Sequence, residues 1–152
     1  MRFFTLLLAC LFSVPLSAQN GDIVTPPSNI EYGQSCNDDA IVFWLSAPKR
    51  GDNLDALVVT EDHAGPSSVA LLAFGFLKDR LLIGYAGSKP CYLLVAPAWV
   101  TPFPLRYGIG SRPLFRVPND PLLKGLPLFA QAYHLSPNGR VVMSRGQQMS
   151  VR

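Results

Sequence analysis

Seven prolines between residues 97 and 127 constrain the fold of this chain more than any other feature of its sequence. They are Pro97, Pro102, Pro104, Pro113, Pro118, Pro121 and Pro127. Proline lacks an amide hydrogen, so it breaks the interior of a helix and is confined within sheets to edge strands and bulges. This part of the chain therefore predicts edge strands and connectors, and it excludes a long helix.

Short apolar runs separated by turn residues fill most of the remaining chain. Residues 41–46, 54–60, 68–75 and 90–96 are expected to be strands, because they are rich in β-branched, aliphatic and aromatic side chains. Residues 68–75 (SVALLAFG) are apolar at both alternating positions, which is typical of a central strand. Residues 81–86 are apolar but short. No segment carries the apolar spacing of an amphipathic helix.

The C-terminal third continues the strand pattern around one helical turn. Further strands are expected at residues 114–117, 126–136, 141–144 and 147–151, the last two as a closing hairpin. Residues 119–125 (NDPLLKG) predict a short helical turn, with a capping Asn or Asp, an early Pro and a final Gly. The sequence thus predicts an all-β fold, an antiparallel β-sandwich of about eight short strands in one domain over residues 31–152.

The first 18 residues have the pattern of a secretory signal peptide. Arg2 is a minimal basic start, residues 3–14 are mostly apolar, and small residues precede the expected cleavage after Ala18. A transmembrane anchor is one alternative, but a span needs roughly 18 apolar residues. A lipoprotein signal at Cys10 is another. We expect a secreted, periplasmic or cell-surface chain that starts with an extended arm over residues 19–30 and has no integral membrane segment.

The cysteine count agrees with export. The chain has three cysteines, and removal of the signal peptide removes Cys10 and leaves Cys36 and Cys91. Two cysteines in an exported chain of this size indicate one disulfide, whereas two free thiols are the alternative. Neither cysteine has a CxxC partner or a neighbouring metal ligand, so the sequence gives little support to a redox or zinc role.

Charged residues are few and unevenly distributed. Residues 19–100 hold nine acidic and five basic side chains, whereas residues 101–152 hold one acidic and seven basic ones. The seven bases do not cluster, so an ordinary solvated surface is favoured over a basic binding face. The sequence carries no basic helix, RNP-like strand, zinc finger or phosphate loop. We therefore expect no nucleic-acid partner and no nucleotide cofactor.

Five motifs follow one another along the chain. They are YGxxC (residues 32–36), LLAFG (71–75), CxLxV (91–95), PNDPLLKGLPLFAQAYHLSPNG (118–139) and a final SxG (144–146). This pattern resembles an uncharacterised family of secreted β-sandwich proteins of planctomycetes and related environmental bacteria. The positions that carry the longest motif are Asn119, Asp120, Pro121, Leu123, Gly125, Leu128, Gln131, Ala132, Leu135 and Pro137. The resemblance implies a secreted sandwich with a Cys36–Cys91 disulfide, and it implies no particular activity.

Catalytic constellations are weak in this sequence. A serine hydrolase needs Ser, His and an acid that converge, but the chain has only His63 and His134, and Ser88 lies outside a GxSxG motif. His134 is expected to be a packing or rim residue of a strand. A glycosidase would need paired carboxylates, and Glu31 and Glu61 are the only glutamates. We expect no enzymatic activity.

Three acidic segments offer oxygen ligands to a metal ion. They are Glu61-Asp62 with His63, Asp38-Asp39, and the pair Asp52 and Asp55. None of them has the spacing of an EF-hand or a calcium repeat. We therefore expect no resident metal.

Aromatic side chains are the remaining candidates for a binding role. Trp99 and Tyr107 stand in the proline-rich connector, where we expect them to be exposed and able to stack on a ligand. Trp44 alternates with Val42 on a strand, which is typical of a sandwich core. The sequence favours a structural or interaction module without catalysis, whose partner is an extracellular protein or a glycan. A small carbohydrate- or surface-binding domain is the alternative.

Overall fold

The computed structural model describes residues 29–36, 41–61, 67–135 and 141–152. Within them it contains eleven strands and one short 3₁₀ helix. In chain order these are β1 (Ile30–Tyr32), β2 (Ile41–Leu45), β3 (Asn53–Thr60), β4 (Ser68–Gly75), β5 (Leu77–Ala86), β6 (Lys89–Ala96), β7 (Trp99–Leu105), β8 (Ile109–Arg116), η1 (Pro121–Leu123), β9 (Pro127–Leu135), β10 (Val141–Met143) and β11 (Gly146–Ser150). The predicted signal peptide and most of the predicted arm lie outside the described residues.

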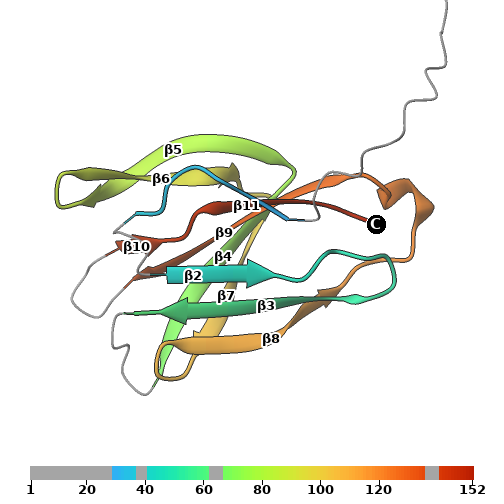
Figure 1. Ribbon diagram of the computed structural model, residues 1–152, viewed down its shortest axis with the longest axis horizontal. Helices are drawn as coiled ribbons and strands as arrows, with labels where there is room; N and C mark the ends of the chain where they lie inside the picture. The colour runs from blue at the N-terminus through green and yellow to red at the C-terminus, as the bar shows by residue number, and fades with distance from the viewer. Residues whose placement is uncertain (1–28, 37–40, 62–66, 136–140) are drawn as a thin grey trace, which may run out of the picture.

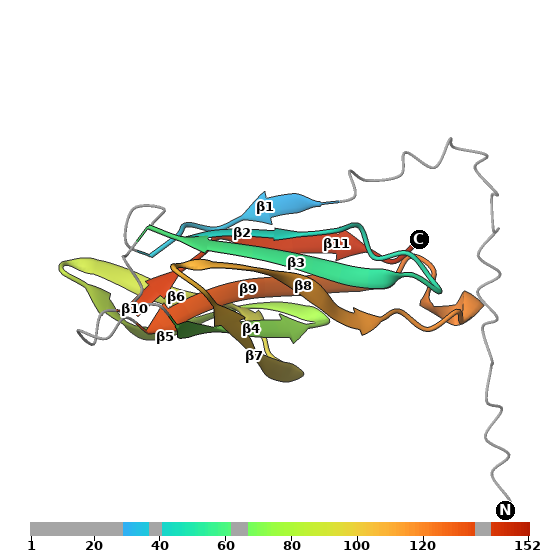
Figure 2. The ribbon, with the colours of Figure 1, turned by 90° about the horizontal axis from the view of Figure 1, so that it is seen from below.

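The strands form three layers, which Figures 1 and 2 show from two sides. A six-stranded sheet has the order β1-β11-β9-β4-β7, and β10 also pairs with β9. A three-stranded sheet, β2-β3-β8, packs on one face of it, and β5 and β6 form a two-stranded ribbon. All pairings are antiparallel, so the predicted all-β sandwich is confirmed, with more strands than the sequence indicated.

The main core lies between the six-stranded and three-stranded sheets. Every second residue of β2 and β3 points into it, namely Ile41, Phe43, Leu45, Leu54, Ala56 and Val58. The facing side chains from the six-stranded sheet include Ala70, Leu72, Phe74, Phe103, Leu105, Leu128, Ala130 and Met149. Burial of these two apolar faces against each other is the main driving force for the sandwich.

Strands β4 and β9 lie in the interior of the six-stranded sheet. β4 pairs with β7 on one side and with β9 on the other, which confirms the prediction of a central strand at residues 68–75. β9 is buried along nearly its whole length. Its apolar character on both faces follows from its position, because the three-stranded sheet covers one face and the ribbon covers part of the other.

The proline-rich region forms two edge strands. β7 contains Pro102 and Pro104 and lies at the end of the six-stranded sheet, whereas β8 contains Pro113 and lies at the end of the three-stranded sheet. The predicted edge positions are therefore confirmed. The sequence treated β7 as a connector, but an edge strand tolerates proline because one of its sides needs no backbone hydrogen bonds.

The short helix agrees with the prediction at residues 119–125. Asp120 caps it, since its Oδ1 accepts a hydrogen bond from the Leu122 amide at 2.9 Å. Gly125 follows the helix with a φ of +80°, a conformation that favours glycine.

The predicted C-terminal hairpin is wrong. β10 and β11 do not pair with each other, because both pair with β9, at residues 133–135 and 127–130 respectively. The two strands are successive segments along one side of β9, and residues 144 and 145 between them interrupt the ladder without reversing the chain. The turn-like composition of residues 144 and 145 therefore marks a break between β10 and β11 and not a reversal of the chain.

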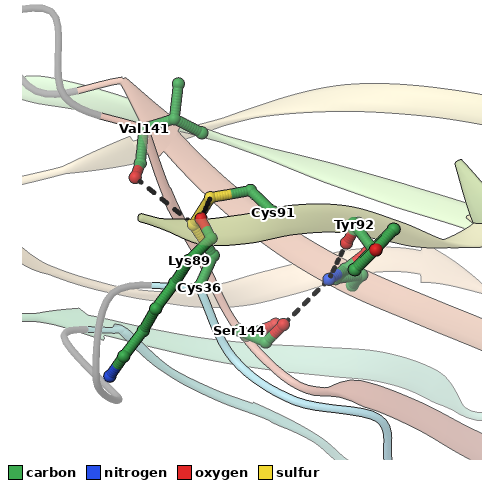
Figure 3. Close-up of a disulfide and its surroundings, with 7 residues drawn as sticks. Cys36, Lys89, Cys91, Tyr92, Val141 and Ser144 are labelled. Atoms are coloured by element: carbon green, nitrogen blue, oxygen red, sulfur yellow. Dashed lines mark hydrogen bonds between the residues drawn. A yellow bond between two sulfur atoms is a disulfide. The ribbon is translucent and has the colours of Figure 1, made fainter. Parts of the chain in front are cut away.

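A disulfide joins the ribbon to the rest of the fold. Cys36 bonds to Cys91 of β6 with a Cα–Cα distance of 5.0 Å, as the sequence and the resemblance predicted (Figure 3). Both cysteines are buried in a small second core with Met143. The strand expected at residues 90–96 is β6, which belongs to the ribbon and not to the six-stranded sheet.

One glutamine makes most of the remaining polar contacts between ribbon and sheet. Gln131 of β9 is fully buried, and its Oε1 accepts the Leu94 amide hydrogen at 2.8 Å. Its Nε2 donates to the carbonyl oxygens of Tyr92 and Ser144, which Figure 3 labels. The Tyr32 hydroxyl donates to the Leu94 carbonyl at 2.8 Å. Side chains therefore form the hydrogen bonds to the backbone groups of Tyr92 and Leu94 on this edge of β6 that a neighbouring strand would otherwise form.

Candidate functional site

The outer face of the β2-β3-β8 sheet is apolar and open to solvent. Val42 and Trp44 of β2 are 55% and 50% exposed. Strand register places Val42 beside Val59 and Val59 beside Ile109, while Trp44 lies beside Leu57. We call these five side chains the outer face. Because the register aligns them in adjacent rows, they form one continuous uncharged surface.

The expectation that Trp44 lies in the core is wrong. Ile41, Phe43 and Leu45 face the core, so Val42 and Trp44 point the opposite way. The five residues of β2 are all apolar, and alternation alone could not decide which set is buried. The sequence feature that points to a binding surface is that β2 is apolar on both of its faces, since a sandwich needs only one apolar face for its core.

Tyr107 lies at one end of the outer face. It occupies the tight turn between β7 and β8, which an Arg106–Ile109 bridge closes, and is 77% exposed. Its φ of +50° is unusual for a residue other than glycine, and Gly108 follows with a φ of +79°. The turn conformation thus holds an aromatic ring in solvent, as the sequence predicted for Tyr107.

A polar hollow of about 660 Å³ continues the β2-β3 surface beyond Trp44. Its walls are Ser46, Ala47, Lys49, Gly51, Asp52, Asn53, Asp55, Arg116 and Arg152. Ser46 lies two residues after Trp44, and Asp55 lies two residues before Leu57. A hydrogen bond from the Asp55 amide to Ser46 Oγ, at 2.9 Å, fixes the two strands at this boundary.

The hollow offers both hydrogen-bond donors and acceptors. The Lys49 ammonium and the Asp52 carboxylate form an exposed ion pair at 3.3 Å. Arg116 Nε donates to the Gly51 carbonyl at 2.8 Å, which holds the guanidinium in place. Because opposite charges are mixed, the arrangement suits a ligand rich in hydroxyl groups better than a strongly charged one.

The second predicted aromatic candidate, Trp99, is only half-buried and belongs to an aromatic cluster. Its ring stacks on Phe74 with centroids 5.2 Å apart, and it contacts Phe115 at 5.8 Å and Phe76 at 5.9 Å. Trp99 is the first residue of β7, so it does not share the outer face with Trp44. The structure does not bring Trp99 and Tyr107 into one site.

The candidate catalytic residues are dispersed. Ser88 lies in the β5–β6 turn, whereas His134 is buried in β9, in register with Ala70. Glu31 of β1 forms an ion pair with Arg145 at 3.6 Å, and Glu61 follows β3.

Metal ligands do not cluster in the described part of the chain, which contains no group of three or more His, Cys, Asp or Glu side chains suited to an ion. His63, Asp62, Asp38 and Asp39 lie outside the described residues. Asp52 and Asp55 both line the polar hollow. The one helix in the described part of the chain, η1, is not long and apolar enough to span a membrane.

Comparisons with known proteins give no match. The chain matches no protein-family model, curated protein or solved structure. The resemblance to a planctomycete family stays a prediction, and arguments about function rest on the residues of the chain itself.

Proposed function

We propose that this chain is a non-catalytic interaction module that binds its partner through the outer face. The observation that carries the proposal is Trp44, whose indole is half-exposed among the uncharged side chains of the outer face. A contiguous exposed apolar surface is typical of interaction sites, because leaving it in water is unfavourable. Tryptophan also contributes more to binding than most side chains when a ligand covers it.

A glycan is the partner class that this surface fits best. A sugar ring has an apolar face that can stack on an aromatic ring, and its hydroxyl groups need donors and acceptors close by. Trp44 supplies the ring, and the polar hollow that begins at Ser46 supplies both kinds of hydrogen-bonding group. A protein partner would use the apolar rows alone and would leave the hollow without a role.

The proposed location is outside the cytoplasm. The buried Cys36–Cys91 disulfide supports it, because such bonds persist in oxidising compartments. The secretory pattern of residues 1–18 supports it independently. The module would therefore meet glycans of the envelope or of the medium.

A glycan array tests this function. The wild-type chain is expected to bind neutral glycans, and Trp44→Ala should reduce the signal by roughly ten- to a hundredfold, as loss of a central aromatic contact does. Val100→Ala is the matched control, because Val100 is 46% exposed but lies on β7, away from the outer face. Equal loss in both variants would contradict the assigned surface. If the wild-type chain binds no glycan, the proposal of a glycan partner is overturned and a protein remains as the partner class.

The non-catalytic part of the proposal has its own readout. Bound glycan should be recovered at its original length after prolonged incubation. The appearance of new reducing ends, in proportion to protein concentration, would show hydrolysis and overturn this part alone.

A further inference from the structure

Two basic side chains of the C-terminal third, which show no cluster in the sequence, come together in the fold. Arg106 and Arg112 line a hollow of about 240 Å³ at the β7–β8 edge of the sandwich, together with Pro104, Ile109, Gly110 and Ser111. We call it the arginine hollow. Its described lining contains no acidic side chain, whereas that of the polar hollow includes Asp52 and Asp55.

The arginine hollow follows from a hairpin whose strands separate. Backbone hydrogen bonds of 2.8 and 3.0 Å join Arg106 and Ile109 in both directions, and beyond this pair β7 and β8 enter different sheets (Figure 2). Pro102 and Pro104 have no amide hydrogen, so β7 cannot continue the ladder toward β8. Gly110 keeps the strands close at the base, because a Cβ there would lie 2.6 Å from the Pro104 carbonyl oxygen.

The Arg112 guanidinium is held in place at one wall of the hollow. Its Nη2 donates to the Pro102 carbonyl at 2.7 Å, and its Cζ lies 5.2 Å from the centroid of the Phe103 ring. A guanidinium has five N–H donors, so these contacts leave donors for a ligand. Because the planar group is already oriented, little entropy is lost when it binds.

Neither guanidinium forms an ion pair within the described part of the chain. The ion pairs between described residues lie elsewhere, at Lys49 with Asp52 and at Glu31 with Arg145. Two positive charges beside one hollow attract an anion, since each adds to the potential there. Guanidinium N–H groups also match the geometry of a negatively charged group with two or more oxygen atoms.

Ser111 connects the arginine hollow to the outer face. Strand register places Trp44 beside Leu57 and Leu57 beside Ser111, so these side chains form one row across β2, β3 and β8. The row crosses two strand spacings and is about 10 Å long. Ile109 belongs to both surfaces. A glycan that stacks on Trp44 and runs across the strands therefore reaches the hollow.

We propose that the arginine hollow binds an oxyanion, a carboxylate or a sulfate group, carried by the glycan on the outer face. That the group belongs to a glycan rests on the proposed function, whereas the binding of an oxyanion by the hollow does not. Pro104 and Ile109 provide apolar walls for the sugar ring that carries the group, and Ser111 provides a hydroxyl. A free inorganic ion would leave these walls without a role.

Monosaccharide titrations followed by nuclear magnetic resonance of the arginine side chains test the oxyanion site without the outer face. The probes are glucuronate, a glucose sulfate ester and, as their neutral counterpart, glucose. We expect saturable shifts of the Arg106 and Arg112 Nε–H signals with at least one of the two anions and none with glucose. The two anions distinguish a carboxylate site from a sulfate site. Shifts with neither anion, or equal shifts with glucose, overturn the proposal.

Arg112→Gln should weaken binding of the anion by roughly tenfold, because a charge-assisted contact is lost. Arg80→Gln is the matched control, because Arg80 also lies over an aromatic ring, that of Tyr92 at 4.4 Å, but belongs to the ribbon. Equal loss in both variants, or no loss in Arg112→Gln, overturns the assigned site. If Arg112→Gln lowers the melting temperature, Arg106→Gln replaces it, since Arg106 is exposed, and an unchanged affinity has the same meaning.

The link to the outer face has an outcome of its own on the glycan array. Glycans that carry uronate or sulfate groups should bind about tenfold more tightly than their neutral parents, and Arg112→Gln should abolish this difference. Equal binding of acidic glycans and neutral parents by the wild-type chain overturns the link. If no glycan binds, the proposed function fails, while the monosaccharide titration still decides whether the hollow is an oxyanion site.

Discussion

The Leu94 amide of β6 donates to Gln131 Oε1 of β9 at 2.8 Å, so a side chain takes the place of a strand neighbour. The same side chain uses both hydrogens of its Nε2 on the carbonyl groups of Tyr92 and Ser144. Gln131 is fully buried; two of the three groups that it satisfies lie in β6, and the third, the Ser144 carbonyl, lies between β10 and β11. One side-chain amide therefore attaches the ribbon to the sheet together with the Cys36–Cys91 disulfide and the Tyr32 hydrogen bond.

Substitution of this amide should loosen the ribbon. Gln131→Leu keeps the approximate volume but leaves a buried donor and two carbonyl groups without their partner. Each buried unsatisfied group costs about 1–3 kcal/mol, so we expect a loss of about 3 kcal/mol in the free energy of unfolding. Urea denaturation measures it. Gln148→Leu, on the neighbouring strand β11 and half-buried, is the control and should cost less than about 1 kcal/mol.

Removal of the disulfide should also destabilise the fold. Cys36→Ser with Cys91→Ser removes a cross-link over a sequence separation of 55 residues, for which we expect a loss of about 2–5 kcal/mol. Thiol titration of the denatured, unreduced protein provides the matching chemical readout. No reactive thiol from residues 36 and 91 is expected, and two per chain would contradict the bond.

Stability should fall in alkali because of Tyr32. Burial raises the pKa of its hydroxyl well above the usual value of about 10, since the charged phenolate is disfavoured there. The folded chain therefore holds this proton more tightly than the unfolded chain does. The stabilisation is fully present below about pH 10 and is lost as the pH rises toward the raised pKa. Tyr32→Phe should flatten this part of the pH–stability curve. Tyr107→Phe, at an exposed position, should leave it unchanged.

Gly146 is required by a close contact with the same tyrosine. The two residues are opposite each other in β11 and β1, and a Cβ at position 146 would overlap the Tyr32 ring. Gly146→Ala should therefore lower the free energy of unfolding by about 1–3 kcal/mol. Gly84→Ala is the strand control, because a Cβ there meets open space. Thermal denaturation of both variants compares them, and equal melting temperatures would refute the contact.

The sequence predicted the class of fold because its evidence is local. Proline positions indicated edges or connectors around Pro102, Pro104 and Pro113, and residues 68–75 indicated a central strand. The order of strands depends on pairings between distant segments, which composition does not encode. For that reason residues 144–147 were misread as a reversal, although β10 and β11 both pair with β9 and follow each other along it.

The candidate site was harder to predict than the fold. Residues 41–45 are apolar at every position, so either face could have been the core, and Trp44 was assigned to the wrong one. The polar hollow combines residues 46–55 with Arg116 and Arg152, which are close only after folding. The role of Gln131 is equally dependent on the fold, because one polar residue in an apolar strand does not reveal its partners.

Fluorescence of two single-tryptophan variants tests the central claim, that Trp44 binds a glycan. The chain has two tryptophans, so Trp99→Phe retains Trp44 and Trp44→Phe retains Trp99. Each variant is titrated with three neutral chains, cellohexaose, chitohexaose and mannohexaose. We predict a saturable change in emission of the Trp99→Phe variant with at least one of them and none in the Trp44→Phe variant. Unchanged Trp44 emission with all three, or a response confined to Trp99, would contradict the account.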